Sequence, residues 1–119
     1  MWLSAGPIVS SIKLATAGEY LTDTTGRTLY VFADDKKLVS SCNGECAVEW
    51  PPFMYDNKDI KKYDDMLSKR MNVIKRADGT LQYAYGEKPL YYYKGDKNPG
   101  GRNGHHQEMG KWTFVPVTK

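Results

Sequence analysis

Two small groups of side chains in this sequence could bind a metal or do redox chemistry. Cys42 and Cys46 form a Cys-x-x-x-Cys pair. One helical turn would place their Cα atoms about 6 Å apart, a separation that a disulfide tolerates. The same spacing would also serve a thiolate metal or redox site. The chain lacks the βαβ pattern of the thioredoxin-like proteins that use such a pair, so the likeness to them is one of spacing only.

The second group follows a glycine-rich stretch near the end of the chain. His105 and His106 are the only histidines, and Glu108 and Met109 come directly after them. Neutral imidazole and thioether groups suit copper, and imidazole also suits zinc. We therefore take His105, His106 and Met109 as a candidate metal site. The alternative is that two adjacent histidines in a loop simply face solvent.

A motif that occurs twice must position these groups. Residues 27–35 and 88–96 share the pattern Leu-Tyr-x-[Phe/Tyr]-x-x-Asp, and every shared position is related by the same offset along the chain. If each copy is a strand, its two aromatic residues share one face, because side chains alternate along a strand. The aspartate arrives where turn residues begin and is expected to fix that turn. The motif residues are Tyr30, Phe32 and Asp35 in the first copy and Tyr91, Tyr93 and Asp96 in the second.

The repeat extends beyond the motif. Trp50 and Trp112 are related by nearly the same offset, one position longer than that of the motif, which a single insertion in the second loop would explain. Each half then reads as hairpin, motif strand, variable loop and tryptophan. Because a half of this size cannot bury its own aromatic face, we expect two halves that pack around a shared core with approximate twofold symmetry.

The local patterns predict a mainly β fold with one or two short helices. Nine Tyr, three Trp and three Phe, with eleven Gly and six Pro, favour strands joined by tight turns. Turn signals predict hairpins over residues 19–34 and 71–85. A short helix around Cys46, capped by a serine of the pair at 40–41, and an amphipathic helix within 56–69 are also expected.

These motifs, in this order, resemble a family of bacterial secreted or lipoprotein repeats with the motif Tyr-x-(Phe/Trp/Tyr)-x-x-Asp. The resemblance covers roughly residues 18–117 and includes the segments at 21–30, 42–52, 76–82, 88–96 and 110–112. It implies export to the bacterial periplasm, outer membrane or exterior, and it carries no general biochemical activity. In an exported protein, a structural disulfide becomes the leading interpretation of Cys42 and Cys46.

We expect residues 1–10 to form an N-terminal arm and residues 11–119 to form a single domain of two repeats, at about 18–52 and 72–117. Residues 1–14 lack the basic region of a signal peptide. The resemblance implies an exporting segment that was removed before Met1, so membrane attachment would require an N-terminal lipid lost with it.

Charge and motifs limit the function. The 17 basic and 14 acidic residues are interspersed, giving a net charge of +3, which argues against a nucleic-acid partner. We find no assembled catalytic constellation, so we expect a monomeric, non-enzymatic structural or binding module. The alternatives are a small copper-binding protein that uses the histidines, and a glycan- or peptide-binding module that uses exposed motif aromatics, of which Tyr92 is expected to be the most exposed.

Overall fold

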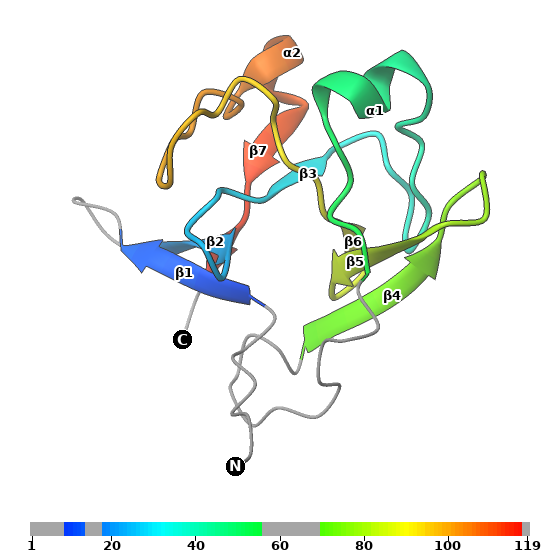
Figure 1. The fold of residues 1–119 in the computed structure, drawn as a ribbon, viewed down its shortest axis with the longest axis horizontal. Helices are drawn as coiled ribbons and strands as arrows, with labels where there is room; N and C mark the ends of the chain where they lie inside the picture. Colours follow the sequence, from blue (N-terminus) through cyan, green and yellow to red (C-terminus); the bar gives the residue numbers. More distant parts are fainter. Residues whose placement is uncertain (1–8, 14–17, 56–69, 118–119) are drawn as a thin grey trace.

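The computed structural model describes residues 9–13, 18–55 and 70–117 and has the predicted mainly β fold (Figure 1). Three small antiparallel sheets have the strand orders β1-β2-β8, β3-β7 and β4-β5-β6. The strands are β1 (Val9–Lys13), β2 (Glu19–Asp23), β3 (Tyr30–Phe32), β4 (Met71–Lys75), β5 (Leu81–Tyr85), β6 (Lys88–Pro89), β7 (Trp112–Phe114) and β8 (Pro116–Val117). The helices are α1 (Glu45–Glu49) and α2 (Gln107–Gly110).

Each half begins with one hairpin, and the two hairpins are equivalent. β1 pairs with β2 in a register that sets Val9 opposite Asp23, and β4 pairs with β5 in a register that sets Met71 opposite Tyr85. The offset that relates Trp50 to Trp112 also relates each residue of the first pair to its counterpart in the second. In Figure 1 the two hairpins lie on opposite sides of the molecule, with β3 between them and both helices at one end. This arrangement is the pseudo-symmetry that the repeated motif predicts.

The two halves exchange their last strands. β2 of the first half pairs with β8 of the second half, and β5 of the second half forms a bridge to Met54 of the first half. Likewise, β3 pairs with β7, while the N–H of Tyr92 in the second motif donates to the carbonyl of Pro51. Two of the three sheets therefore contain strands from both repeats, and the third, β4-β5-β6, is bridged to the first repeat at Met54, so neither repeat completes its hydrogen bonding alone.

The two motif tyrosines meet at the centre of the molecule. The backbone N–H of Tyr30 donates to the carbonyl of Tyr91 at 2.8 Å, and the N–H of Tyr91 donates to the carbonyl of Tyr30 at 2.9 Å. Both residues are completely buried. This reciprocal pair marks the place where the two repeats cross.

Four aromatic rings form a column through the core. Trp50 and Trp112 stack in parallel with centroids 3.9 Å apart. Phe32 of the first half stacks on Trp112 at 4.3 Å, and Tyr93 of the second half packs on Trp50 at 4.4 Å. Each tryptophan thus carries a motif ring from the other repeat, which places the column between the halves. A second cluster buries aliphatic side chains, namely Val9, Leu21, Leu29, Leu90, Val115 and Val117.

Three local details depart from the sequence predictions. Strand geometry in the second motif is limited to β6, with a single bridge residue at Tyr91, because the chain there changes partners from β5 to Tyr30 and Pro52. No serine caps α1, whose N-cap is Gly44 with no side-chain hydrogen bond. The helix predicted within 56–69 lies outside the described residues, as does the arm up to residue 8; Val9 is buried in β1.

No helix in the described ranges is both long enough and apolar enough to cross a membrane.

Candidate functional site

The motif aspartates connect the two repeats. Tyr30 donates its hydroxyl hydrogen to Asp96 at 2.6 Å, and Tyr91 donates to Asp35 at 2.7 Å. Each bond joins the tyrosine of one motif copy to the aspartate of the other. Burial, followed by the aspartate hydrogen bond, raises the pKa of Tyr30 well above its usual range, so its hydroxyl stays protonated. The repeated motif therefore joins the two halves through a pair of reciprocal tyrosine–aspartate hydrogen bonds.

The second oxygen of each aspartate holds the following loop. Asp35 accepts hydrogen bonds from the backbone and side chain of Ser41, and Asp96 accepts one from the backbone N–H of Asn103. The sequence predicted an aspartate that fixes its own turn. It did not predict that the same carboxylate also binds the tyrosine of the other repeat. The equal spacing of tyrosine and aspartate in the two copies was the only available signal.

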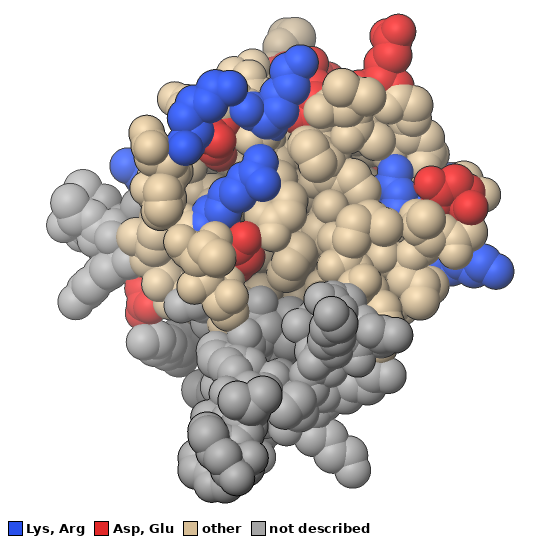
Figure 2. All heavy atoms as spheres, in the orientation of Figure 1, with Lys and Arg blue, Asp and Glu red and all other residues tan. Residues whose placement is uncertain are grey.

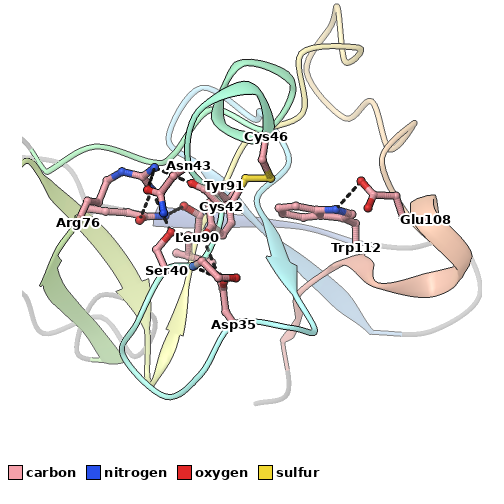
Figure 3. Close-up of a disulfide and its surroundings, with 12 residues drawn as sticks. Asp35, Ser40, Cys42, Asn43, Cys46, Arg76, Leu90, Tyr91, Glu108 and Trp112 are labelled. Carbon is pink, nitrogen blue, oxygen red and sulfur yellow. Dashed lines mark hydrogen bonds between the residues drawn. A yellow bond between two sulfur atoms is a disulfide. The ribbon is translucent and has the colours of Figure 1, made fainter. Parts of the chain in front are cut away.

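A buried arginine organises the first loop (Figure 3). Arg76 is only 6% exposed and donates to the Ser40 hydroxyl, the Gln82 side chain, the Cys42 carbonyl and the Asn43 side chain. These acceptors are neutral oxygens, each of which offsets part of the cost of burying a guanidinium group. The network fixes the backbone on which the cysteines sit.

Cys42 and Cys46 form a disulfide with a Cα–Cα distance of 5.2 Å. Cys42 is fully buried beside Trp50 and Tyr91, and Cys46 is half-buried against the same cluster. The bond closes the loop that leads into α1 and packs it on the aromatic column. This environment suits a structural crosslink, since one of its two sulfurs belongs to a buried residue.

The candidate metal residues lie on a strained turn around α2. His106, Glu108 and Met109 have φ values of 70°, 53° and 61°, a backbone region that residues other than glycine rarely occupy. The rings of His105 and His106 are 4.0 Å apart, and the Met109 side chain is fully exposed. Among the described residues, no group of three or more His, Cys, Asp and Glu side chains is placed to hold a metal ion.

His105 is partly engaged by the fold. Its ring stacks on Phe114 at 3.9 Å, and its Nδ1 accepts the Phe114 backbone N–H at 3.2 Å. Desolvation, followed by the nearby charges of His106 and Arg102, lowers the pKa of His105, which favours the neutral ring. Only its Nε2 remains for a further ligand. The carboxylate of Glu108 accepts the Trp112 indole N–H at 3.1 Å.

The motif aromatics form no flat exposed platform among the residues that the structure describes. Tyr92, expected to be the most exposed of them, is half-buried among Phe53 and Arg27, and its hydroxyl donates to Asp23 at 2.8 Å. The Arg27 guanidinium lies 4.2 Å from the centre of its ring. Tyr92 therefore fills a site within the protein and offers little to a ligand.

A groove of about 810 Å³ lies along β3, β6 and β7. Val31, Val115 and Pro89 give it apolar walls, and Thr113 and Tyr85 also line it. No sequence signal pointed to this groove, because its lining comes from both repeats and from the loop after β3. We call it the basic groove for the charges described next.

Basic side chains outnumber acidic ones around the basic groove. The cations are Lys36, Lys37, Arg70, Lys88 and Lys111, and the carboxylates are Asp35 and Glu87. Lys37 pairs with Glu87 and Lys111 pairs with Asp34, both at 2.8 Å, while Asp35 is held by Tyr91 and Ser41. Lys36 and Lys88 are exposed and form no ion pair within the described part of the chain. The groove therefore favours a negatively charged ligand.

Figure 2 shows how charged side chains are distributed over one face of the molecule. On that face the basic and acidic side chains are scattered, with wide neutral areas between them. This pattern agrees with the interspersed charges of the sequence.

The fold is a tandem repeat of one β unit. Strands of one copy pair with strands of the other, and each motif tyrosine bonds the aspartate of the other copy. A family described as a secreted repeat of unknown function matches residues 11–54 and 72–115, which together cover most of the chain. The protein belongs to this family of secreted repeats, in agreement with the resemblance seen in its motifs. No curated protein and no solved structure matches the chain.

Proposed function

We propose that this protein is a non-enzymatic binding module of the bacterial envelope that holds an anionic ligand in the basic groove. The observation that carries the proposal is the groove itself: about 810 Å³ of space with apolar walls and five basic side chains against two carboxylates. Apolar walls with a few polar groups at the rim are the usual features of a ligand site. Unpaired lysines at a rim attract anions and speed their binding.

The proposal is tested with two anionic probes, a hexaglutamate peptide and an oligogalacturonate of the same charge. Backbone amide shifts in NMR titrations locate the contact. We expect shifts at Val31, Lys88 and Thr113 with at least one probe. Lys36→Glu with Lys88→Glu should weaken that binding by at least about tenfold, because two attractive charges become repulsive.

Lys94→Glu with Lys97→Glu is the matched control. Lys94 and Lys97 are exposed, and the motif offset makes Lys97 the counterpart of Lys36 in the other repeat. The control should keep wild-type affinity. Absence of groove shifts with either probe at millimolar concentration, or equal weakening by both double variants, would show that the groove is not a binding site.

A second candidate function is copper binding through His105, His106 and Met109. The contact between the two histidine rings, 4.0 Å apart, and the fully exposed thioether support it. Copper should raise the melting temperature through linkage to the folded state, and His105→Ala with His106→Ala should abolish the rise. Met54→Leu, which alters another exposed methionine, is the control. No rise at saturating copper would exclude this function.

A further inference from the structure

The two repeats contain the same site in two states, one filled and one open. In the filled state, the ring of Tyr92 packs edge-on against Phe53 with centroids 5.5 Å apart, lies 4.2 Å from the Arg27 guanidinium, and bonds Asp23 through its hydroxyl. An acidic side chain at the hydroxyl and a cation over the ring therefore hold a tyrosine in this place.

Backbone hydrogen bonds fix which residues correspond in the other repeat. The N–H of Lys94 donates to the carbonyl of Glu49, and the N–H of Ala33 donates to the carbonyl of Lys111 in the same way, so Lys94 and Ala33 are equivalent. Tyr92 and Val31 each lie two residues before these donors and are therefore equivalent as well. The N–H of Tyr83 donates to Phe53 as that of Leu21 donates to Val115, which makes Phe53 and Val115 equivalent.

The other two members of the filled site also have counterparts. Asp23 pairs with Val9 as Tyr85 pairs with Met71, so Tyr85 takes the place of Asp23. The N–H of Asp23 donates to Arg27, and in the other repeat Tyr85 lies opposite Lys88. The counterparts of the filled site are thus Val31, Tyr85, Lys88 and Val115, and all four line the basic groove.

The groove is therefore open at the position where the other repeat places its own tyrosine. Valine at position 31 is much smaller than tyrosine, and both Val31 and Val115 line the open groove. Lys88 supplies a cation as Arg27 does. The Tyr85 hydroxyl, which also lies 3.5 Å from the Arg70 guanidinium, replaces the Asp23 carboxylate, so the open site lacks the acid of the filled one.

We infer that the basic groove takes a tyrosine side chain from an acidic peptide segment of a partner protein. This inference rests on the proposed function and names its ligand. The ring would occupy the place that Tyr92 fills in the other repeat, and acidic neighbours would face Lys36 and Lys88. A peptide is chosen over a glycan because the occupant of the equivalent site is itself a tyrosine of a polypeptide chain.

Three peptides of equal charge test the inference: acetyl-Glu-Asp-Tyr-Asp-Glu-amide and the same peptide with Ala or Leu at the centre. We expect the tyrosine peptide to bind at least about tenfold more tightly than the alanine peptide, since burial of an aromatic ring is strongly favourable. Contacts between its ring protons and the methyl groups of Val31 and Val115 should appear as intermolecular NOEs in the wild-type protein.

Val31→Tyr should abolish binding of the tyrosine peptide, because the new tyrosine would occupy the open site as Tyr92 occupies the filled site. Val48→Tyr, on the exposed face of α1, is the control and should bind normally. If Val31→Tyr does not fold, the NOEs in the wild-type protein decide the question.

The outcomes separate this inference from the proposed function. Equal binding of the tyrosine and alanine peptides would overturn the ring site and leave an anion-binding groove. Groove shifts with oligogalacturonate and none with any peptide would overturn the peptide ligand and leave the proposed function intact. Normal peptide binding by Val31→Tyr would also overturn the ring site.

Discussion

The loops that precede the two tryptophans occupy equivalent places and are held by different chemistry. The offset that relates Trp50 to Trp112 also relates Cys42 to Gly104 and Cys46 to Glu108. In the first repeat a disulfide closes the loop. In the second repeat Glu108 instead accepts the indole N–H of Trp112 (Figure 3).

Each loop structure has an energetic cost close to its own tryptophan. The indole N–H of Trp50 is buried and has no hydrogen-bond partner among the described residues, since a disulfide stands where the other repeat has a carboxylate. The second repeat satisfies its indole and stores strain instead, with positive φ at three side-chain-bearing residues of α2 and its N-cap. Gly104 has no room for a side chain: a Cβ atom there would lie 2.8 Å from the Trp50 ring. The shared aromatic column therefore constrains both loops, and each loop packs against it through different contacts.

Removal of either tryptophan should have the largest effect. Trp50→Ala and Trp112→Ala each delete half of the central stack, and each should lower the free energy of unfolding by about 3–5 kcal/mol. Urea denaturation measures both. Similar losses would support a core shared equally by the repeats, and a small loss at either position would contradict it.

The crossed tyrosine–aspartate bonds should be unequal. Tyr30→Phe leaves Asp96, only 6% exposed, without its hydroxyl donor and should cost about 2–3 kcal/mol. Tyr91→Phe should cost about 1 kcal/mol, because Asp35 is half-buried and water can replace the lost donor. Urea midpoints of the two variants provide the comparison. A larger loss for Tyr91→Phe would mean that burial of the carboxylate does not set the cost.

The disulfide of the first loop and the Glu108–Trp112 hydrogen bond of the second should contribute differently to the free energy of unfolding. Cys42→Ala with Cys46→Ala should lower stability by about 2 kcal/mol, as expected for a disulfide that closes so short a loop. Glu108→Ala should cost about 1 kcal/mol, since it leaves the Trp112 indole unbonded, as that of Trp50 already is. A reducing agent should destabilise the wild type and the Glu108 variant alike and leave the cysteine-free variant unchanged. Insensitivity of the wild type would indicate that the disulfide contributes nothing.

The smallest expected effect is a pH dependence confined to the second repeat. Burial lowers the pKa of His105 in the folded protein, so the unfolded state binds the proton more tightly. The contribution of the neutral ring is present above the unfolded pKa of about 6.5 and is lost as the pH falls through the lower folded value. His105→Gln should therefore reduce the loss of stability between about pH 7.5 and pH 5, measured by urea midpoints. His106→Gln should keep most of this loss of stability, because burial, and not the charge of His106, is the largest cause of the lowered His105 pKa.

Much of the architecture was predictable from residue spacing. The constant offsets between Tyr30 and Tyr91 and between Trp50 and Trp112 predicted two equivalent halves with a common aromatic core, and the Asp-Gly turn predicted the β4–β5 hairpin. The hairpin expected over 19–34 was wrong: β2 pairs with β1 and β8, and only a bridge from Thr22 to Thr28 spans the Thr-Gly turn. The metal site at His105, His106 and Met109 stays a prediction. The expected serine cap and exposed Tyr92 were wrong, because Ser40, Ser41 and Tyr92 all found partners outside their own local segment.

Residue spacing alone specifies that one β unit is repeated, because hydrophobic alternation and turn residues act over a few neighbouring positions. Three features arise only in the folded molecule: β2 and β3 pair with strands of the other repeat, each motif tyrosine donates to the other repeat's aspartate, and Val31 lines the basic groove at the position where the other repeat packs Tyr92. These outcomes depend on contacts between residues far apart in the chain, such as Tyr30 with Asp96, and a local pattern carries no information about which distant partner will complete it.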